Sequence, residues 1–135
     1  MRAQALDLIQ RYYAAFNAGD MPAFLSLLSD EIVHDINQGQ RETGRAAFAA
    51  FMQHMNRCYR EQLVDLRIMA NEDGTHAAAE FTVLGEYLVT DEGLPPAKGQ
   101  SYRLPAGAFF QIEAGRIKRI TNYYNLQDWV AQVGG

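Results

Sequence analysis

The sequence is poor in several features that would point to particular protein classes. It has one cysteine, Cys58, in 135 residues, which excludes an internal disulfide and any site built from several thiolates. No apolar run approaches the ~20 residues of a membrane span, and the net charge of −4 is not gathered into a block of like charges. A membrane-spanning chain is therefore not expected, and neither nucleic acid nor a membrane surface is expected as a partner.

The N-terminal segment also lacks the apolar stretch of a secretory signal, because Asp7, Gln10 and Arg11 interrupt it. Together with the single cysteine, this predicts a cytoplasmic location. A length of 135 residues, with 48% hydrophobic and 21% charged side chains, is typical of one globular domain. We expect a single domain over residues 1–135, since no linker or repeat divides the chain.

The first half of the chain shows a helical spacing of its apolar residues. Apolar residues spaced by three and four predict a helix over 3–17, which ends at the segment NAGD. Asp20 can cap a second, short helix. A short strand is expected around 32–37, and a third helix over 45–57.

The second half alternates between apolar and polar residues, as strands do. Pro105 and Gly107 predict a bend or bulge in the third of these strands. The chain then ends in a short tail, 127–133. The expected strands cover 61–71, 76–90, 101–113 and 116–126.

This order of elements predicts an α+β fold. Three N-terminal helices would pack on one face of a curved antiparallel sheet. Helices lying against a concave sheet face would enclose a pocket.

Asp35 occupies an unusual place in the strand segment EIVHDINQG. In a strand it lies on the same face as Val33, while His34 points the other way. A carboxylate on an apolar face is costly unless it is paired or used. Asp35 is therefore either a general base in an apolar cavity or a strand-end carboxylate satisfied by backbone or solvent.

Four segments together resemble the NTF2-like superfamily, and in particular its ketosteroid-isomerase-related, SnoaL-like members. They are QRYYAAFNAGD, the VHD strand, TGRAAFAAFM and FFQIEAGRIKRI. The resemblance covers nearly the whole chain and implies the cone-shaped fold of that family. It implies an enzyme of the ketosteroid isomerase or SnoaL type, performing cofactor-free acid–base chemistry on a small apolar carbonyl compound, by isomerisation or aldol-type cyclisation. The alternative is a non-catalytic module that holds a hydrophobic metabolite in the same cavity.

The resemblance also assigns catalytic roles. In ketosteroid isomerase an Asp moves the proton, while a Tyr and a protonated Asp hold the oxyanion. Asp35 matches the base and Tyr12 matches the Tyr, whereas Gly107 stands where the second acid belongs. Asn122, placed inside the pocket by the match of the final strand, could partly replace that acid. Tyr12 could equally be a core residue, and Asn122 could be satisfied by neighbouring backbone.

The expected pocket wall is largely aromatic, which favours a small apolar or aromatic ligand. No metal site is expected, because His34, His54 and His76 are scattered without ligand spacing, and no cofactor motif is present. Cys58 is expected to be buried and inert. The residues predicted to bind the substrate are Phe51, His54, Phe81, Val83, Phe109 and Tyr124.

The outer sheet face is expected to carry an apolar set that is too large to face water. A second subunit should cover it, so a homodimer through the outer sheet face is predicted, as the resemblance also implies. The set is Leu104, Ala106, Ala108, Phe110 and Ile112.

Overall fold

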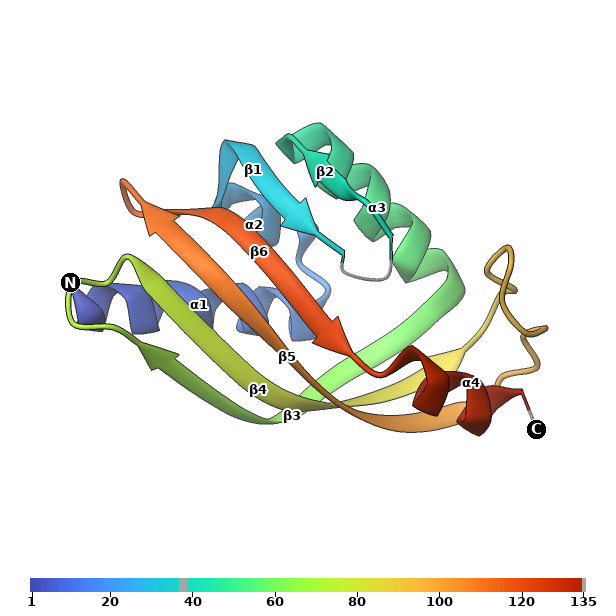
Figure 1. Cartoon of the computed structure of the whole chain (residues 1–135). Coiled ribbons are helices and arrows are strands. Elements are labelled where there is room, and N and C mark those ends of the chain that lie inside the picture. The colour runs from blue at the N-terminus through green and yellow to red at the C-terminus, as the bar shows by residue number, and fades with distance from the viewer. Residues whose placement is uncertain (37–38, 135) are drawn as a thin grey trace.

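A curved sheet forms the body of the molecule, and helices lie against its concave side in the computed structural model, which describes residues 1–36 and 39–134 (Figure 1). The elements follow the order α1 (Arg2–Ala18), α2 (Met21–Ser26), β1 (Leu28–Asp35), β2 (Arg41–Thr43), α3 (Arg45–Cys58), β3 (Tyr59–Ala70), β4 (His76–Tyr87), β5 (Ser101–Glu113), β6 (Arg116–Tyr124) and α4 (Leu126–Val133).

The sheet has six strands among the described residues, in the order β2-β1-β6-β5-β4-β3. The predicted α+β class is confirmed, with two corrections to its details. The sheet is not wholly antiparallel, because β1 pairs with β6 in parallel. The expected strand to position 37 ends at Asp35, and Asn37 lies outside the described residues.

The picture of three N-terminal helices is incomplete, because the predicted C-terminal tail is a helix, α4. The Asn125 side chain begins it by accepting a hydrogen bond from the Asp128 backbone N–H (3.1 Å). Trp129 and Val133, one turn apart, are its buried residues. Across 1–36 and 39–134, no helix combines the length and apolar character required to cross a membrane.

The boundary between α1 and α2 follows the predicted chemistry. Gly19 ends α1 in the left-handed conformation, with φ of 70°. The Asp20 carboxylate then accepts a hydrogen bond from the Ala23 backbone N–H (3.2 Å) and caps α2. Just before this turn, the Asn17 amide exchanges two hydrogen bonds with the Leu63 backbone (2.9 and 3.0 Å), which fixes the end of α1 on β3.

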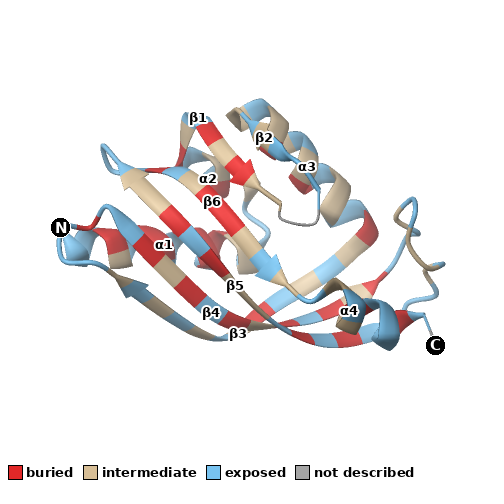
Figure 2. Cartoon of the chain, viewed as in Figure 1, coloured by how far each residue is buried: buried red, intermediate tan, exposed pale blue. Residues whose placement is uncertain are grey.

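The core lies between the helices and the concave sheet face, where buried residues alternate with exposed ones along the strands (Figure 2). On β4 the inward set includes Phe81 and Val83, as predicted. The Phe81 ring packs against Tyr13 of α1, with ring centroids 5.3 Å apart. The largest fully buried core side chains include Ile9, Phe24, Phe48, Tyr87, Phe110 and Ile120.

The inward face of β5 is opposite to the predicted one. Val83 pairs directly with Leu104, and Ala79 with Ala108, in an unbroken antiparallel register without the expected bulge. Directly opposed residues share a sheet face, so Leu104 and Ala108 point inward. Phe109 consequently points outward, where it is 53% exposed, and its predicted place in the pocket is wrong.

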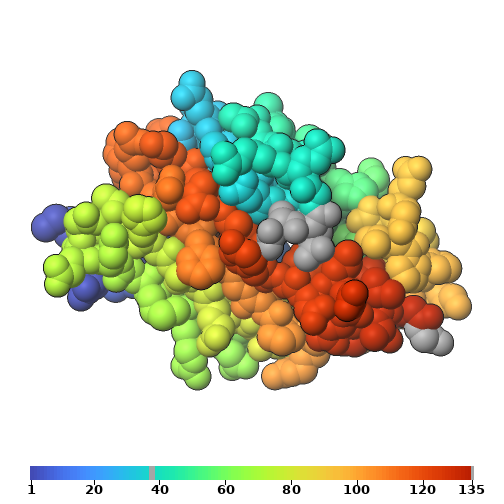
Figure 3. Space-filling view, in the orientation of Figure 1, coloured from blue at the N-terminus to red at the C-terminus, as the bar shows by residue number. Residues whose placement is uncertain are grey.

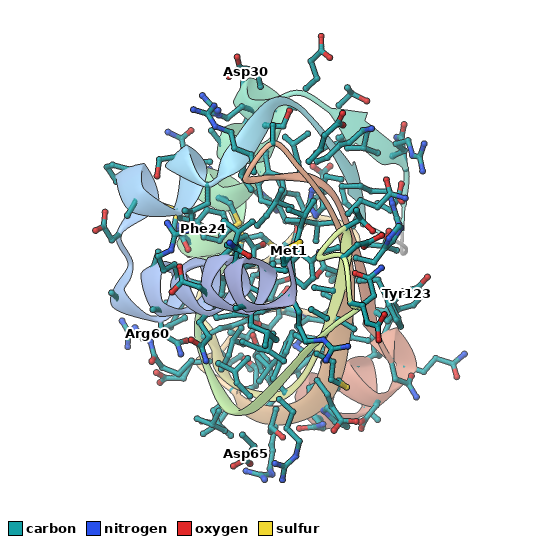
Figure 4. The ribbon with its side chains drawn as sticks, turned by 90° about the vertical axis from the view of Figure 1, so that its left-hand side faces the viewer. Met1, Phe24, Asp30, Arg60, Asp65 and Tyr123 are labelled. Atoms are coloured by element: carbon teal, nitrogen blue, oxygen red, sulfur yellow. The ribbon has the colours of Figure 1, made fainter. Side chains whose placement is uncertain are left out.

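The same register removes the reasoning behind the expected homodimer, because Leu104, Ala108 and Phe110 are buried against the helices of the same chain. The outer face instead exposes Phe109 and Tyr123, whose rings meet edge to face with centroids 5.6 Å apart. In Figure 4, Tyr123 projects on the side of the sheet away from α1. A homodimer through this face stays a prediction.

The C-terminal helix closes one end of the curved sheet. Trp129 of α4 packs edge to face against Tyr59, Tyr87 and Tyr102, with ring centroids 5.0 to 6.0 Å apart. Helix α4 also contacts the loop that follows β4, as the space-filling view shows (Figure 3). At this contact the Gln100 amide donates a hydrogen bond to the Val133 carbonyl (2.9 Å).

Candidate functional site

A cavity of about 400 Å³ lies between the helices and the concave face of the sheet. Its wall is mainly aromatic and aliphatic, as expected of a site for a small apolar molecule. Three hydrogen-bonded groups of polar side chains also include residues that reach it. Apolar and aromatic residues in the wall include Tyr12, Phe24, Phe51, Phe81, Leu104 and Trp129.

Most of the predicted site residues meet at this cavity. Those that line it are Tyr12, Asn122, Phe51, His54, Phe81, Val83 and Tyr124. They come from α1, α3, β4 and β6, so the fold brings together residues that are far apart in the sequence. Their placement agrees with the sequence, while their roles in binding or catalysis stay predictions.

Asp35 does not reach the cavity, and the prediction that it projects there is wrong. Its carboxylate accepts two hydrogen bonds from the Arg41 guanidinium (2.6 and 3.1 Å) and one from the Thr121 hydroxyl (2.9 Å). The Arg119 guanidinium lies 3.7 Å away. The hydrogen bonds from Arg41 are the main cause that lowers the pKa of Asp35. This paired, ionised carboxylate is a structural group rather than a general base, and its partners are side chains instead of the expected backbone or solvent.

The register of the sheet explains why Asp35 faces outward. Asp35 pairs with Thr121 on β6, and Thr121 pairs with the exposed Phe109 on β5. This row of residues therefore lies on the outer face, and the preceding residue, His34, faces inward. The predicted alternation of His34 and Asp35 was correct, but the face assigned to each was reversed.

His34 supplies the first polar group of the cavity. Its ring stacks on Phe48, with centroids 4.3 Å apart, and meets Phe51 edge-on at 4.8 Å. The Asn122 amide Nδ2 donates to His34 Nε2 (3.2 Å). His34 is only 2% exposed, and burial lowers its pKa to about 4. The imidazole is therefore neutral at neutral pH.

Glu61 and Tyr102 form the second group, across three neighbouring strands. Glu61 pairs with Gly85, and Gly85 pairs with Tyr102, on the inner face. The Tyr102 ring crosses the bare backbone of Gly85, where a Cβ would lie 2.3 Å from the ring, and its hydroxyl donates to the Glu61 carboxylate. Burial raises the pKa of Glu61, and the hydrogen bond from Tyr102 opposes that rise.

The third group lies where α3 ends beside the loop after β4. The Asp91 carboxylate accepts hydrogen bonds from the Tyr59 hydroxyl (2.8 Å) and from His54 Nε2 (2.8 Å). All three residues line the cavity. His54, predicted to edge the pocket, does so within this hydrogen-bonded set.

Reasoning from the sequence missed His34, Glu61, Tyr102 and Asp91. His34 was lost through the reversed strand face. For Glu61 and Tyr102 a signal was present: Gly85 lies on the inward set of β4, and a glycine in a strand often marks a place where a neighbouring group approaches closely. Asp91 lies in a loop, where periodicity gives no information.

The fold and the cavity define a class of protein, the NTF2-like cone. A candidate polyketide cyclase from Pseudomonas putida KT2440 is 67% identical over 96% of this chain and 97% of that chain, with a TM-score of 0.95. A candidate polyketide cyclase from Xanthomonas campestris pv. campestris is 57% identical over 97% of both chains, with a TM-score of 0.94. A candidate ketosteroid isomerase from Kribbella flavida DSM 17836 shares the fold at 22% identity, covering 92% of this chain and 79% of that one, with a TM-score of 0.68.

The SnoaL-like domain family matches residues 9–120 of the sequence. The protein therefore belongs to the SnoaL-like domain family, as its sequence segments indicated, and its fold is that of NTF2-like proteins. No curated protein matches the sequence significantly.

Proposed function

We propose that the protein is an enzyme of the ketosteroid isomerase or SnoaL type, which performs acid–base chemistry on a small apolar carbonyl compound. The observation that carries this proposal is a partly buried carboxyl group, Glu61, in the wall of an otherwise mainly apolar cavity. The reaction is a proton transfer next to the carbonyl, leading to isomerisation or to aldol-type ring closure. It needs no cofactor.

Glu61 is the group that moves the proton. Burial raises its pKa toward the range in which a carboxylate both accepts and returns a proton near neutral pH. Tyr102 holds the carboxylate by a hydrogen bond, which fixes the direction of the remaining oxygen lone pairs. Glu61 thus takes the role that the sequence assigned to Asp35.

The reaction also requires groups that stabilise negative charge on the substrate oxygen. Asn122, held by the neutral imidazole of His34, and the phenol of Tyr12 are the polar groups of the cavity suited to this. Burial raises the pKa of Tyr12, so its hydroxyl keeps its proton and can donate a hydrogen bond. A neutral imidazole can also polarise a carbonyl without a net charge in the apolar site.

Replacing Glu61 by Gln tests the proposal. The purified protein is screened against steroid enones, aromatic polyketide esters and epoxides, and the variant is assayed on the substrate found. We expect Glu61→Gln to lower turnover by roughly 10²–10⁴-fold, the usual contribution of a general base. In the unchanged protein, kcat/KM should rise with pH through the raised pKa of Glu61, and this rise should vanish in the variant.

Glu80→Gln is the matched control, because Glu80 is exposed on the outer face of the neighbouring strand β4. It should leave turnover and its pH dependence unchanged. A Glu61→Gln variant that turns over at the original rate would remove Glu61 from the mechanism. Binding of these compounds without turnover in the unchanged protein would contradict the enzymatic proposal altogether.

A further inference from the structure

Three side chains with metal-binding atoms converge at the end of α3. His54 Nε2, Cys58 Sγ and a carboxylate oxygen of Asp91 lie within 4.8 Å of one another. His54 and Cys58 are four residues apart on α3, so they share one helix face. Asp91 approaches from the loop after β4. The scattered histidines predicted no metal site, and His54 here lies beside Cys58 and Asp91 instead of a second histidine.

The arrangement around His54 is not that of a catalytic triad. In a triad the nucleophile and the acid contact opposite nitrogens of the imidazole. Here Cys58 Sγ lies 3.9 Å from Nε2, and the Asp91 oxygen lies 2.8 Å from the same nitrogen. The other nitrogen, Nδ1, accepts a hydrogen bond from Arg57 (3.2 Å). Cys58 is also fully buried, so no substrate can meet it as a nucleophile.

We propose that His54, Cys58 and Asp91 bind a divalent cation of the zinc class. Three donors around one point, of nitrogen, sulfur and oxygen type, are a set that this cation takes in proteins. In a tetrahedral site the nitrogen–oxygen and nitrogen–sulfur separations are about 3.3 and about 3.6 Å. The observed 2.8 and 3.9 Å reach those values through side-chain movements of about half an ångström. The sulfur and oxygen atoms, which lie within 4.8 Å of each other, must approach to about 3.6 Å, a movement of about one ångström.

The surroundings prepare Asp91 for this role. Its second carboxylate oxygen accepts a hydrogen bond from the Tyr59 hydroxyl (2.8 Å), and its backbone N–H donates to the Tyr87 hydroxyl (2.9 Å). Oriented ligands of this kind are typical of metal sites. A Cys58 thiolate and the Asp91 carboxylate together carry two negative charges, which balance the divalent cation.

The fourth position of such an ion remains for a water or an oxygen of the cavity ligand. His54 and Asp91 both line the cavity, so the ion would lie in its wall. Binding releases the Cys58 thiol proton to solvent. The His54 proton moves from Nε2, which becomes the ligand atom, to Nδ1.

Arg57 is a neighbour that opposes the ion. It is a cation, and its guanidinium donates to His54 Nδ1, the atom that must carry the proton once Nε2 binds metal. Its side chain therefore has to turn away when the ion binds. Removing it should favour the metal, which separates this proposal from a purely structural role for His54.

The test is a titration of the chelator-treated full-length protein with Co²⁺, followed by displacement with Zn²⁺. We expect a thiolate-to-cobalt charge-transfer band in the near ultraviolet, lost when zinc replaces cobalt. Cys58→Ala should abolish the band, and Cys58→Ala and Asp91→Asn should each weaken zinc binding at least tenfold. Arg57→Ala should tighten it several-fold.

His76→Gln is the control, because His76 is exposed at the β3–β4 hairpin and should not affect binding. Thermal unfolding in chelator verifies that each variant is folded. If Cys58→Ala is unstable, Asp91→Asn still tests the proposal, because it leaves the helix core untouched. Absence of the cobalt band, or zinc affinity unchanged in Asp91→Asn, would overturn the proposal. None of these readouts depends on enzymatic turnover.

Discussion

His34 and Asp35 are neighbours in the sequence, and the two faces of the sheet treat them in opposite ways. On the concave face, burial keeps His34 neutral, with its pKa lowered to about 4. On the convex face, Arg41 keeps Asp35 charged, with its pKa lowered as well. The same direction of change thus has opposite consequences for charge.

Other ionisable groups on the two faces show the same difference in charge. Inside, Glu61 has a raised pKa, and the tyrosines of the wall keep their protons. Outside, Asp35 forms an ion pair with Arg41 and lies near Arg119. On the concave face, burial thus favours the neutral forms of His34, Glu61 and the wall tyrosines, which suits proton transfer, whereas the polar groups of the outer face are paired as ions.

The largest expected effect is the pH dependence of stability due to His34. The unfolded chain binds its proton near the ordinary pKa of 6.5, and the folded chain only near 4. Stability is therefore complete above pH 6.5 and falls by about 3 kcal/mol as the pH drops to 4. Chemical denaturation across this range should show a shallower fall in His34→Phe, which keeps the ring packing and removes the titration.

The free energy of unfolding is compared between His34→Phe and the unchanged protein at each pH. This comparison is needed because carboxylates such as Asp35 also lose stabilising interactions in acid. A His34→Phe variant with the original slope would mean that the imidazole takes up its proton inside the folded protein. The cavity would then not exclude charge.

The next effect concerns Gly85, where the close approach of Tyr102 leaves no room for a side chain. Gly85→Ala puts a Cβ 2.3 Å from the Tyr102 ring, so the ring must move. We expect a loss of about 2 kcal/mol in unfolding free energy, as in other overpacked cores. The pKa of Glu61 should rise further, because the hydrogen bond from Tyr102 is broken.

Urea denaturation measures the stability, and nuclear magnetic resonance titration of the Glu61 carboxyl measures the pKa. Gly39→Ala serves as control, since a Cβ there meets nothing within 4 Å. Equal stability of Gly85→Ala and Gly39→Ala would contradict the packing of Tyr102 over the strand.

The smallest effect is expected at Asp35. Asp35→Asn removes an ion pair with an exposed arginine, Arg41, and should cost about 1 kcal/mol or less in unfolding free energy at neutral pH. The cost should disappear in strong acid, because the contribution of Asp35 is lost as the pH falls through its lowered pKa. Turnover of the substrate found in the screen should not change, and a large loss would return Asp35 to the catalytic site.

Periodicity predicted most of the fold correctly. The spacing of apolar residues, the capping Asp20 and the turn at Gly19 are local signals, and the elements began and ended close to where those signals lie. The short strand β2 and the helix α4 were missed. β2 has only three residues, and α4 depends on packing of Trp129 against tyrosines of distant strands.

The site was predicted less completely, for a physical reason. Alternation tells which residues share a face, but not which face is the inner one. His34 with Asp35, and Phe109 with Phe110, were therefore assigned in reverse. Only the pairing of strands across the sheet, from Val83 through Leu104 to β6, settles the choice, and that pairing is a long-range property.

Trp129 is the single tryptophan of the sequence, and it is part of the cavity wall, against three tyrosine rings. The protein thus carries its own optical reporter. A ligand that enters the cavity changes the polarity around one indole, so its fluorescence follows occupancy without any added dye. Screening of unlabelled compounds, in turnover-deficient variants as well, can use this emission directly.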